Sequence, residues 1–389
     1  MKQAKPFSGK NILVLEGYCK QVLPFLRGFK KQGCEVSVLC SSKLDCGYAS
    51  RFPDHKILGT CDPHDYEGSE KYIVELIKNG HYDMVYPPFD FSAKILSHNK
   101  KELSKYAIIY ANEPEVFDLA NNKEEVMRVC MENGIPCPQT YFDIETVEDI
   151  DGRIQFPVII KPHSMYGARG FHLFQSAEEM RDYVKEKGIN LNEYVIQEFI
   201  PEGSLMMSGC VMVDRNGEVK SSYVYASEHL YPETGGTSTL NGIVDRPDIQ
   251  TDCEKLVKLM RIQGEVGVDI ILDPRDNVGK AIEINPRAVH AITLGFVAGV
   301  NHAQQILEDA FGMEVTPMEV KDKTIAVRIM QSDVLWFLSS KDRFRRSPKK
   351  LGYKRVKEQM FYWDDPWPWF AFSLGCVRDF RQKMSEKTQ

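Results

Sequence analysis

The residues with the clearest chemistry are three polar side chains on alternate positions late in the sequence. Glu283, Asn285 and Arg287 fall in the stretch "GKAIEINPRAVHAITLGF", which begins at Gly279. Residues two apart on an extended chain point to the same face, so we expect the acid, the amide and the guanidinium to be presented together. A strand that only covered a core would carry apolar side chains on one of its faces. This pattern therefore indicates a site for metal or for anionic oxygen.

A second acid precedes these three residues on what we predict to be the same hairpin. Asp269 lies in "EVGVDIILDPRDNVGK", with the turn expected near Asp273 to Gly279. Facing residues of a hairpin lie within ~5 Å, so Asp269, Glu283 and Asn285 are expected to meet. Mg²⁺ normally binds through one or two carboxylates plus substrate phosphates, and an arginine beside them suits phosphoryl charge. The alternative, a polar strand face exposed to water, gives no reason for the Asn-Pro-Arg ending.

A site for metal and phosphate also needs residues that hold a nucleotide. The P-loop pattern is absent, and Gly17 is not followed by a dinucleotide fingerprint. Instead "VIIKPHSMYGARGFHLF" places Lys161 at the end of a strand. A glycine-containing loop follows, and its amides are candidates to close over phosphates. The loop candidates are Ser164, Gly167, Arg169 and Gly170.

The elements that must position these residues change character along the chain. Residues 1 to about 112 alternate predicted strands and helices, beginning with "NILVLEG", "QVLPFLRGFKKQG" and "CEVSVLC". This order predicts a doubly wound parallel α/β unit with right-handed crossovers. Later residues predict hairpins, including one that turns at Asp214 to Gly217. The fold class is therefore α/β with a following α+β part.

Composition excludes several classes of protein. The 389 residues are 43% hydrophobic and 27% charged, with a net charge of -6, which argues against a dedicated nucleic-acid binder. The ten cysteines form no C-x-x-C pair, so neither a zinc module nor a redox motif is indicated. No signal peptide or long apolar segment is present, and we expect a soluble, cytoplasmic protein with reduced thiols.

Four motifs in this order resemble the ATP-grasp superfamily. They are "FPVIIKPHSMYGARG", "YVIQEFIPEG", "GVDIILD" and "AIEINPR". The match is closest to the carboxylate–amine ligases, with a carbamoyl-phosphate-synthase-like domain, and covers about 113 to 320. The resemblance implies a Rossmann-like domain at 1–112, ATP-grasp lobes at 113–190 and 191–323, and a C-terminal extension at 324–389.

The resemblance also implies roles for individual residues. Lys123 and Lys161 are expected to contact the nucleotide, and Glu198, Phe199 and Ile200 form a hinge that holds adenine. Asp269, Glu283 and Asn285 are expected to bind Mg²⁺, or Mn²⁺, between the phosphates of ATP. Arg287 is expected to contact phosphate, and Arg287 and Lys161 are the catalytic candidates. Glu202 stands near the usual ribose-binding acid, where this chain has Ser204.

Departures from the family pattern narrow the expected reaction. D-alanine–D-alanine ligases usually carry arginine where this chain has Gly267, and biotin carboxylases continue differently after their Asn-x-Arg. The implied reaction joins a small-molecule carboxylate to an amine: the carboxylate attacks ATP to give an acyl phosphate and ADP, and the amine displaces phosphate. Two alternatives stay open, a carboxylase or phosphotransferase with a non-amine acceptor, and a non-catalytic nucleotide-binding protein.

The acceptor side is represented by a loop and one histidine. Gly235, Gly236, Thr237 and Ser238 are expected in a loop beside the acyl phosphate, although a simple surface turn fits equally well. His290 is a candidate either to contact substrate or to cap the next helix. The basic run Arg343 to Lys350 and the aromatic tail after it are most simply a solvated surface. Contact with a membrane surface is the less favoured alternative, and homo-oligomerisation is left open.

Overall fold

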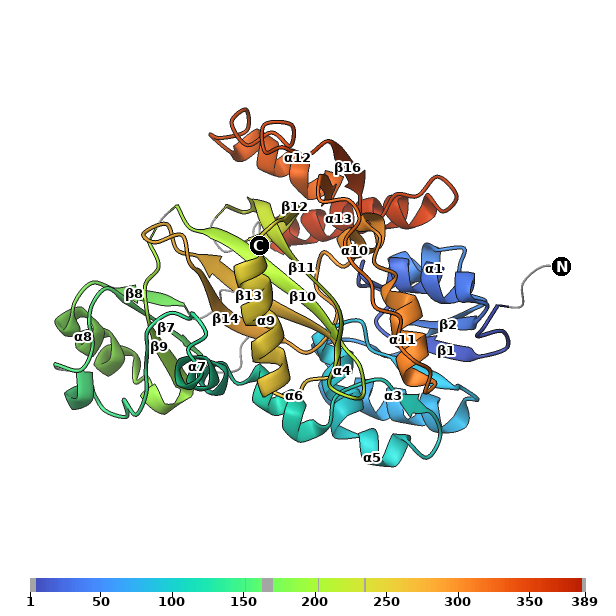
Figure 1. Cartoon of the computed structure of the whole chain (residues 1–389), viewed down its shortest axis with the longest axis horizontal. Helices are drawn as coiled ribbons and strands as arrows, with labels where there is room; N and C mark the ends of the chain where they lie inside the picture. The colour runs from blue at the N-terminus through green and yellow to red at the C-terminus, as the bar shows by residue number, and fades with distance from the viewer. Residues whose placement is uncertain (1–4, 151, 163–170, 202, 234–235, 387–389) are drawn as a thin grey trace.

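Three β-sheets with surrounding helices make up the structure, a computed structural model (Figure 1). It describes residues 5–150, 152–162, 171–201, 203–233 and 236–386. Within these ranges no helix has the length and apolar character needed to cross a membrane. The N-terminal unit lies at one side of the molecule, the four-stranded sheet at the other, and the seven-stranded sheet between them.

The N-terminal unit is a parallel five-stranded sheet, which confirms the predicted doubly wound fold. Its strand order is β3-β2-β1-β4-β5. The strands are β1 (Asn11–Val14), β2 (Glu35–Cys40), β3 (His55–Leu58), β4 (Met84–Tyr86) and β5 (Ile108–Ile109). The helices are α1 (Val22–Gln32), α2 (Cys46–Ala49), α3 (Tyr66–Asn79), α4 (Asp90–His98) and α5 (Lys100–Leu103).

The strand order of this sheet reverses at β1. From β1 the chain runs outward through β2 to β3, and then crosses back to β4 on the other side of β1. In open α/β sheets, ligands bind outside the carboxyl ends of the strands at such a switch point. Glu16 follows β1 there with a φ of 51°, and Asp90 follows β4 as the first residue of α4.

The next unit is a four-stranded antiparallel sheet in the order β6-β9-β7-β8. Its strands are β6 (Thr140–Tyr141), β7 (Val158–Pro162), β8 (His172–Phe174) and β9 (Tyr194–Glu198). The helices of this part are α6 (Pro114–Asn121), α7 (Lys123–Glu132) and α8 (Ala177–Lys187). Because β9 pairs with both β6 and β7, this sheet contains residues on both sides of the lobe boundary expected at 190.

The central sheet has seven strands in the order β14-β13-β10-β11-β12-β15-β16. They are β10 (Leu205–Val213), β11 (Val219–Tyr231), β12 (Thr237–Val244), β13 (Gly264–Leu272), β14 (Gly279–Asn285), β15 (Ile325–Arg328) and β16 (Arg355–Glu358). Both predicted hairpins are present, as β10–β11 and β13–β14. The remaining helices are α9 (Pro247–Leu259), α10 (Thr293–Ala298), α11 (His302–Ala310), α12 (Met330–Ser339) and α13 (Trp367–Glu386).

One hydrophobic core joins the N-terminal sheet to the C-terminal half of the chain. Ile12 and Val14 of β1 share this core with Val289 and Ala303. Helices α1 and α11 approach so closely that a Cβ on Gly28 would lie 2.4 Å from the Cβ of Ala303. This close packing holds the segment after β14 against the carboxyl ends of β1 and β4.

Candidate active site

The β13–β14 hairpin brings the two predicted acids face to face. Asp269 pairs with Glu283, and the register then shifts so that Ile270 pairs with Ala281. Ile282 is the extra residue of this bulge, which lets both Ala281 and Ile284 pack into the core. The turn is closed by Asp273 N–H, which donates to Val278 O at 2.9 Å. The bulge therefore directs Glu283 and Asn285 to the face opposite the core.

A chain of hydrogen bonds holds the predicted metal ligands in place. Ser208 Oγ donates to Asp269 Oδ1 at 2.8 Å, and Asn285 Nδ2 donates to Asp269 Oδ2 at 3.0 Å. Arg287 donates to Asn285 Oδ1 at 2.9 Å. Gly267, two residues before Asp269, has no room for a side chain, because a Cβ there would lie 2.7 Å from Val289 Cγ1. Packing therefore leaves no room at position 267 for the arginine that D-alanine–D-alanine ligases usually carry there.

Two lysines approach Glu283 from the neighbouring elements. Lys123 begins α7, where the Asn122 side chain caps the helix by accepting from the amide of Glu124 at 3.0 Å. Lys123 Nζ lies 3.6 Å from Glu283 Oε2. Lys161 is on β7, and its pKa is lowered to about 8, because burial and the charge of Lys123 outweigh the opposing charge of Glu283.

Burial opposes the charged forms of both acids. Burial raises the pKa of Asp269, although hydrogen bonds from Ser208 and Asn285 partly offset the shift. Burial likewise raises the pKa of Glu283, against the charge of Lys123. A cation and polyphosphate placed between these acids and the two lysines would stabilise all four charged groups.

The residues present suit magnesium only if phosphate completes the coordination. Asp269, Glu283 and Asn285 offer two carboxylates and an amide, the hard oxygen ligands that Mg²⁺ prefers. In the part of the chain that is described, no group of three or more His, Cys, Asp or Glu side chains is arranged to hold a metal. The donor set therefore fits a cation that is shared with a nucleotide.

Arg287 has a partner that sequence reasoning missed. Its guanidinium donates through Nε to Asp90 Oδ1 at 2.9 Å and through NH2 to Asp90 Oδ2 at 2.8 Å. It also lies over the Phe89 ring, 4.7 Å from the centroid. Burial alone would lower the pKa of Arg287, but Asp90 outweighs it, so the pKa is raised. The available signal was the position of Asp90 shortly after the expected strand "YDMVYPP", at the carboxyl edge of an open sheet.

His290 lies beside a buried lysine and does not cap the next helix. The N-cap residue of α10 is Ile292, whereas His290 Nε2 contacts Lys20 Nζ. Burial lowers the pKa of Lys20 to about 7. Burial and the charges of Lys20 and Arg287 lower the pKa of His290 well below its ordinary value. Lys20, which precedes α1, is a second site candidate that the sequence analysis missed.

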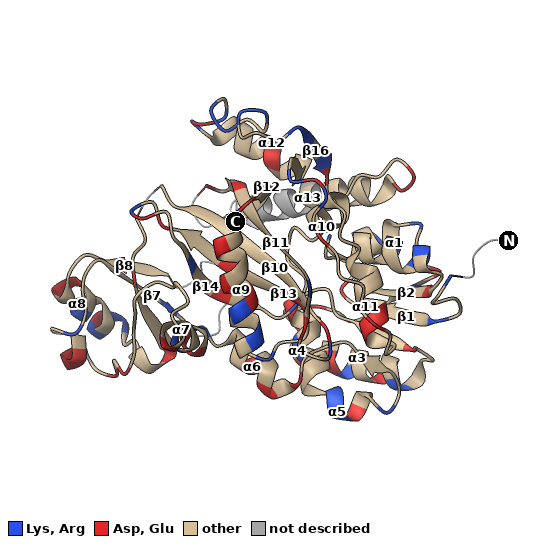
Figure 2. Cartoon of the chain, in the orientation of Figure 1, with Lys and Arg blue, Asp and Glu red and all other residues tan. Residues whose placement is uncertain are grey.

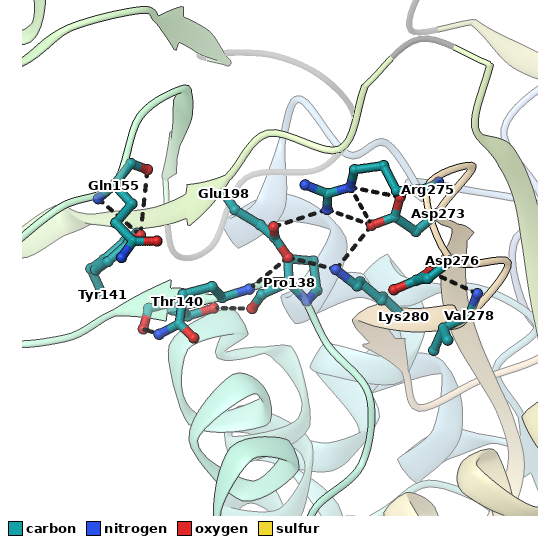
Figure 3. A network of polar contacts seen from close by, with 11 residues as sticks. Pro138, Thr140, Tyr141, Gln155, Glu198, Asp273, Arg275, Asp276, Val278 and Lys280 are labelled. Atoms are coloured by element: carbon teal, nitrogen blue, oxygen red, sulfur yellow. Dashed lines mark hydrogen bonds and ion pairs between the residues drawn. The ribbon is translucent and has the colours of Figure 1, made fainter.

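The predicted hinge carries an ion network that joins the four-stranded sheet to the central sheet (Figure 3). Glu198 binds Lys280 at 2.7 Å and Arg275 at 3.0 Å, and Lys280 also contacts Asp273 at 3.0 Å. Burial alone would raise the pKa of Glu198, but its hydrogen bonds from Lys280 and Arg275 lower it. The Glu198 carboxylate thus joins β9 to the β13–β14 turn, and its contact with adenine stays a prediction.

Phe199 and Ile200, the other predicted hinge residues, follow β9. The amide of Phe199 donates to Pro157 O at 3.0 Å, so its carbonyl is the group suited to contact a ligand. Ile200 is buried, at 7% exposure.

Thr237 and Ser238 were expected in a loop, and this expectation is wrong. They begin β12, where they pair with Tyr231 and Leu230. Gly236 directly precedes this strand. The predicted candidates that lie outside the described residues are Ser164, Gly167, Arg169, Gly170, Glu202 and Gly235.

The chain matches the profile of the ATP-grasp domain family over residues 120–290. Residues 120–290 of this chain therefore form an ATP-grasp domain.

Relatives with known functions are distant. A D-aspartate ligase of Enterococcus faecium is 26% identical over 314 residues, which is 75% of this chain and 70% of that protein. A carbamoyl phosphate synthase large chain of Methanosarcina mazei is 28% identical over 30% of this chain, and the match spans 12% of that protein.

Among solved structures, the biotin carboxylase domain of a Hydrogenobacter thermophilus 2-oxoglutarate carboxylase has a TM-score of 0.66 at 18% identity. The match covers 81% of this chain and 72% of the chain in that structure. That structure is a dimer with magnesium ADP, ADP and bicarbonate. At this identity, the likeness concerns the fold alone.

We expect the Arg287–Asp90 pair to contribute strongly to stability. Asp90→Ala would leave the guanidinium, whose side chain is 11% exposed, buried without its carboxylate. We expect a loss of about 3–5 kcal/mol in the free energy of unfolding, measured by urea denaturation. Asp364→Ala, which removes the 49% exposed partner of Arg27, is the control and should cost about 1 kcal/mol or less. Equal effects of both changes would contradict this role for Asp90.

We expect the ion network around Glu198 to weaken in acid. The pKa values of Glu198 and Asp273 are lowered in the folded chain, so their stabilisation is complete above the ordinary carboxylate range. It is lost as pH falls through the lowered values, below about pH 4. The difference in melting temperature between wild type and Lys280→Met should be constant near pH 7 and shrink in acid. A difference that is unchanged in acid would rule out this network as its source.

Proposed function

We propose that the chain is an ATP-dependent carboxylate–amine ligase that forms an amide bond through an acyl phosphate and releases ADP and phosphate. The observation that carries this proposal is the convergence of Asp269, Glu283 and Asn285 with Lys123 and Lys161. These groups come from the β13–β14 hairpin, α7 and β7, and they present acids and cations to one another. A phosphate chain between them is the natural occupant.

The chain's own residues would position ATP and balance charge. Lys123 and Lys161 would bind phosphate oxygens, and Asp269, Glu283 and Asn285 would hold magnesium. When bound, magnesium would neutralise charge on the phosphates and orient them. Arg287, kept charged and oriented by Asp90, would stabilise the charge that develops on the transferred phosphoryl group. Phosphoryl transfer requires mostly this kind of positioning, and no protein nucleophile.

The acid substrate would bind at the switch point of the N-terminal sheet. Lys20 and His290 lie in contact there, and the pKa of His290 is lowered, toward its neutral form. Among the described residues, Lys20 Nζ forms its side-chain hydrogen bond with His290, and Lys20 is only 8% exposed. An acidic ligand would restore the charged form of Lys20. The similarity to a D-aspartate ligase supports a small acidic amino acid as this substrate.

The amine would approach through a cavity whose lining includes Arg287. This cavity has a volume of about 760 Å³ and lies between residues 104–112 of the N-terminal unit and the segment Pro286 to Ala288. A cavity of this size accommodates a molecule considerably larger than a single amino acid. We assign it to the acceptor, whose amine would displace phosphate from the acyl phosphate.

Removing one predicted metal ligand should abolish turnover without unfolding the chain. We expect Glu283→Gln to reduce ADP release by at least about 100-fold, because charge on the phosphates would no longer be balanced. A second readout, the rise in melting temperature caused by ADP, should lose its dependence on Mg²⁺ in this variant. Glu314→Gln, which alters an exposed acid, is the control and should behave as wild type.

The substrate requirement for ADP release separates the alternatives. Release that needs both a carboxylate and an amine supports the ligase. Release with an acid alone would indicate a non-amine acceptor, as in a carboxylase or phosphotransferase. Magnesium-dependent nucleotide binding without turnover for any pair of substrates would indicate a non-catalytic protein. Full activity in Glu283→Gln would remove the proposed site.

Lys20 provides a separate test of the acid-binding region. We expect Lys20→Met to raise the KM for the acid about 10- to 100-fold through loss of a charge-assisted hydrogen bond, while the KM for ATP stays unchanged. Lys31→Met, which alters an exposed lysine at the end of α1, should leave both values unchanged. A parallel rise in both KM values would place Lys20 at the nucleotide instead.

A further inference from the structure

An exposed apolar helix face lies next to the most basic segment of the chain. On α12, Leu338 is 68% exposed and Val334 and Leu335 are each 46% exposed. Phe344, in the loop that follows, is 67% exposed. We call this face, together with the basic loop after it, the α12 surface. Its residues are Val334, Leu335, Phe337, Leu338, Lys341, Arg343, Phe344, Arg345, Lys349 and Lys350.

The helix and the loop form one continuous surface. The rings of Phe337 and Phe344 pack edge to face, with centroids 5.7 Å apart. Arg343 NH1 donates to Leu338 O at 3.2 Å, and its guanidinium lies 5.8 Å from the Phe344 centroid. Arg343 therefore holds the basic loop against the exposed end of α12, so the apolar face and the basic loop are adjacent.

The opposite face of α12 anchors the helix to the central sheet. Asp333 accepts hydrogen bonds from His229 Nδ1 at 2.7 Å and from Thr239 Oγ1 at 3.0 Å. Trp336 is 4% exposed and stacks on the His229 ring. His229 Nε2 also donates to Arg346 O at 2.7 Å, which ties the loop to the same strand. The core thus uses one face of α12, and Val334 and Leu338 project from the other.

The charge of this region is opposite to that of the whole protein. Residues 341–357 contain nine Lys or Arg and one Asp, whereas the chain has a net charge of -6. Figure 2 shows Lys and Arg along the loop after α12 and on β16. Lys341, Arg345, Lys349 and Lys350 are exposed. Such a concentration of positive charge favours a partner with a dense negative surface.

We propose that the α12 surface docks this protein on a membrane that contains anionic lipids. Apolar side chains that project among basic residues match the interfacial zone of a bilayer: the apolar side chains enter the acyl boundary and Lys and Arg contact lipid phosphates. The apolar side chains protrude from the surface, which favours a bilayer over a protein partner with a shaped groove. This proposal does not depend on the proposed reaction.

Docking here would place the start of β12 close to the membrane. Thr239, which anchors α12, is on β12 one residue after Ser238 and two after Thr237. The α12 surface is therefore anchored close to Thr237 and Ser238. A bound protein would present this end of the central sheet toward the lipid headgroups.

Vesicle flotation with the full chain tests the proposal. Wild type is mixed with phosphatidylcholine vesicles, with and without phosphatidylglycerol, at low and high salt. We expect binding only to the anionic vesicles, and weaker binding in high salt. Arg345→Glu combined with Lys349→Glu should reduce the binding at least about tenfold. Leu338→Asn combined with Phe344→Ser should also reduce it, because apolar insertion is lost.

Matched controls alter residues elsewhere on the surface. Lys71→Glu combined with Lys105→Glu changes the same number of charges in the N-terminal unit, and Leu374→Asn removes a 61% exposed leucine from α13. Both controls should bind as wild type, and melting temperatures would verify that every variant folds. No flotation of wild type with anionic vesicles, or equal loss in variants and controls, would overturn the proposal. Capture of an acidic protein in place of vesicles would also overturn it.

Discussion

The arrangement of the candidate site depends on the buried ion pair between Arg287 and Asp90. Asp90 begins α4 at the carboxyl end of β4, and Arg287 follows β14, so this one pair links the parallel sheet to the central sheet. Arg287 also binds Asn285, which binds Asp269. Because two buried charges are tolerated only with good mutual geometry, the pair fixes the orientation of the hairpin that carries the acids.

Two charge clusters in this molecule behave differently. The Glu198, Lys280, Arg275 and Asp273 network has its opposite charges in direct contact, and hydrogen bonds lower the pKa values of both acids. At the hairpin, burial raises the pKa of Asp269 and Glu283 and lowers that of Lys161. The first cluster therefore joins the four-stranded sheet to the central sheet, whereas the second gains most from a ligand that brings its own charges.

Much of the hairpin could be predicted from sequence, and its surroundings could not. Asp269 faces Glu283 as expected, because a short turn and a period of two determine which residues meet. Asp90 lies 197 residues from Arg287, and Lys20 lies 270 residues from His290, so no local pattern indicated either contact. Thr237 and Ser238 were expected in a loop because glycines precede them, but pairing with β11 makes them strand. The domain boundaries at 112, 190 and 323 stay predictions.

By itself, the sequence determined the parallel N-terminal sheet, the two hairpins and the meeting of Asp269 with Glu283. These features follow from turn residues and from apolar periodicity, which act between neighbours along the chain. Only the tertiary structure decided which charges meet across units: Arg287 with Asp90, Lys20 with His290, and Glu198 with Lys280. The reason is physical, since the partner of a buried charge is set by how separate units pack, and that packing depends on many distant side chains at once.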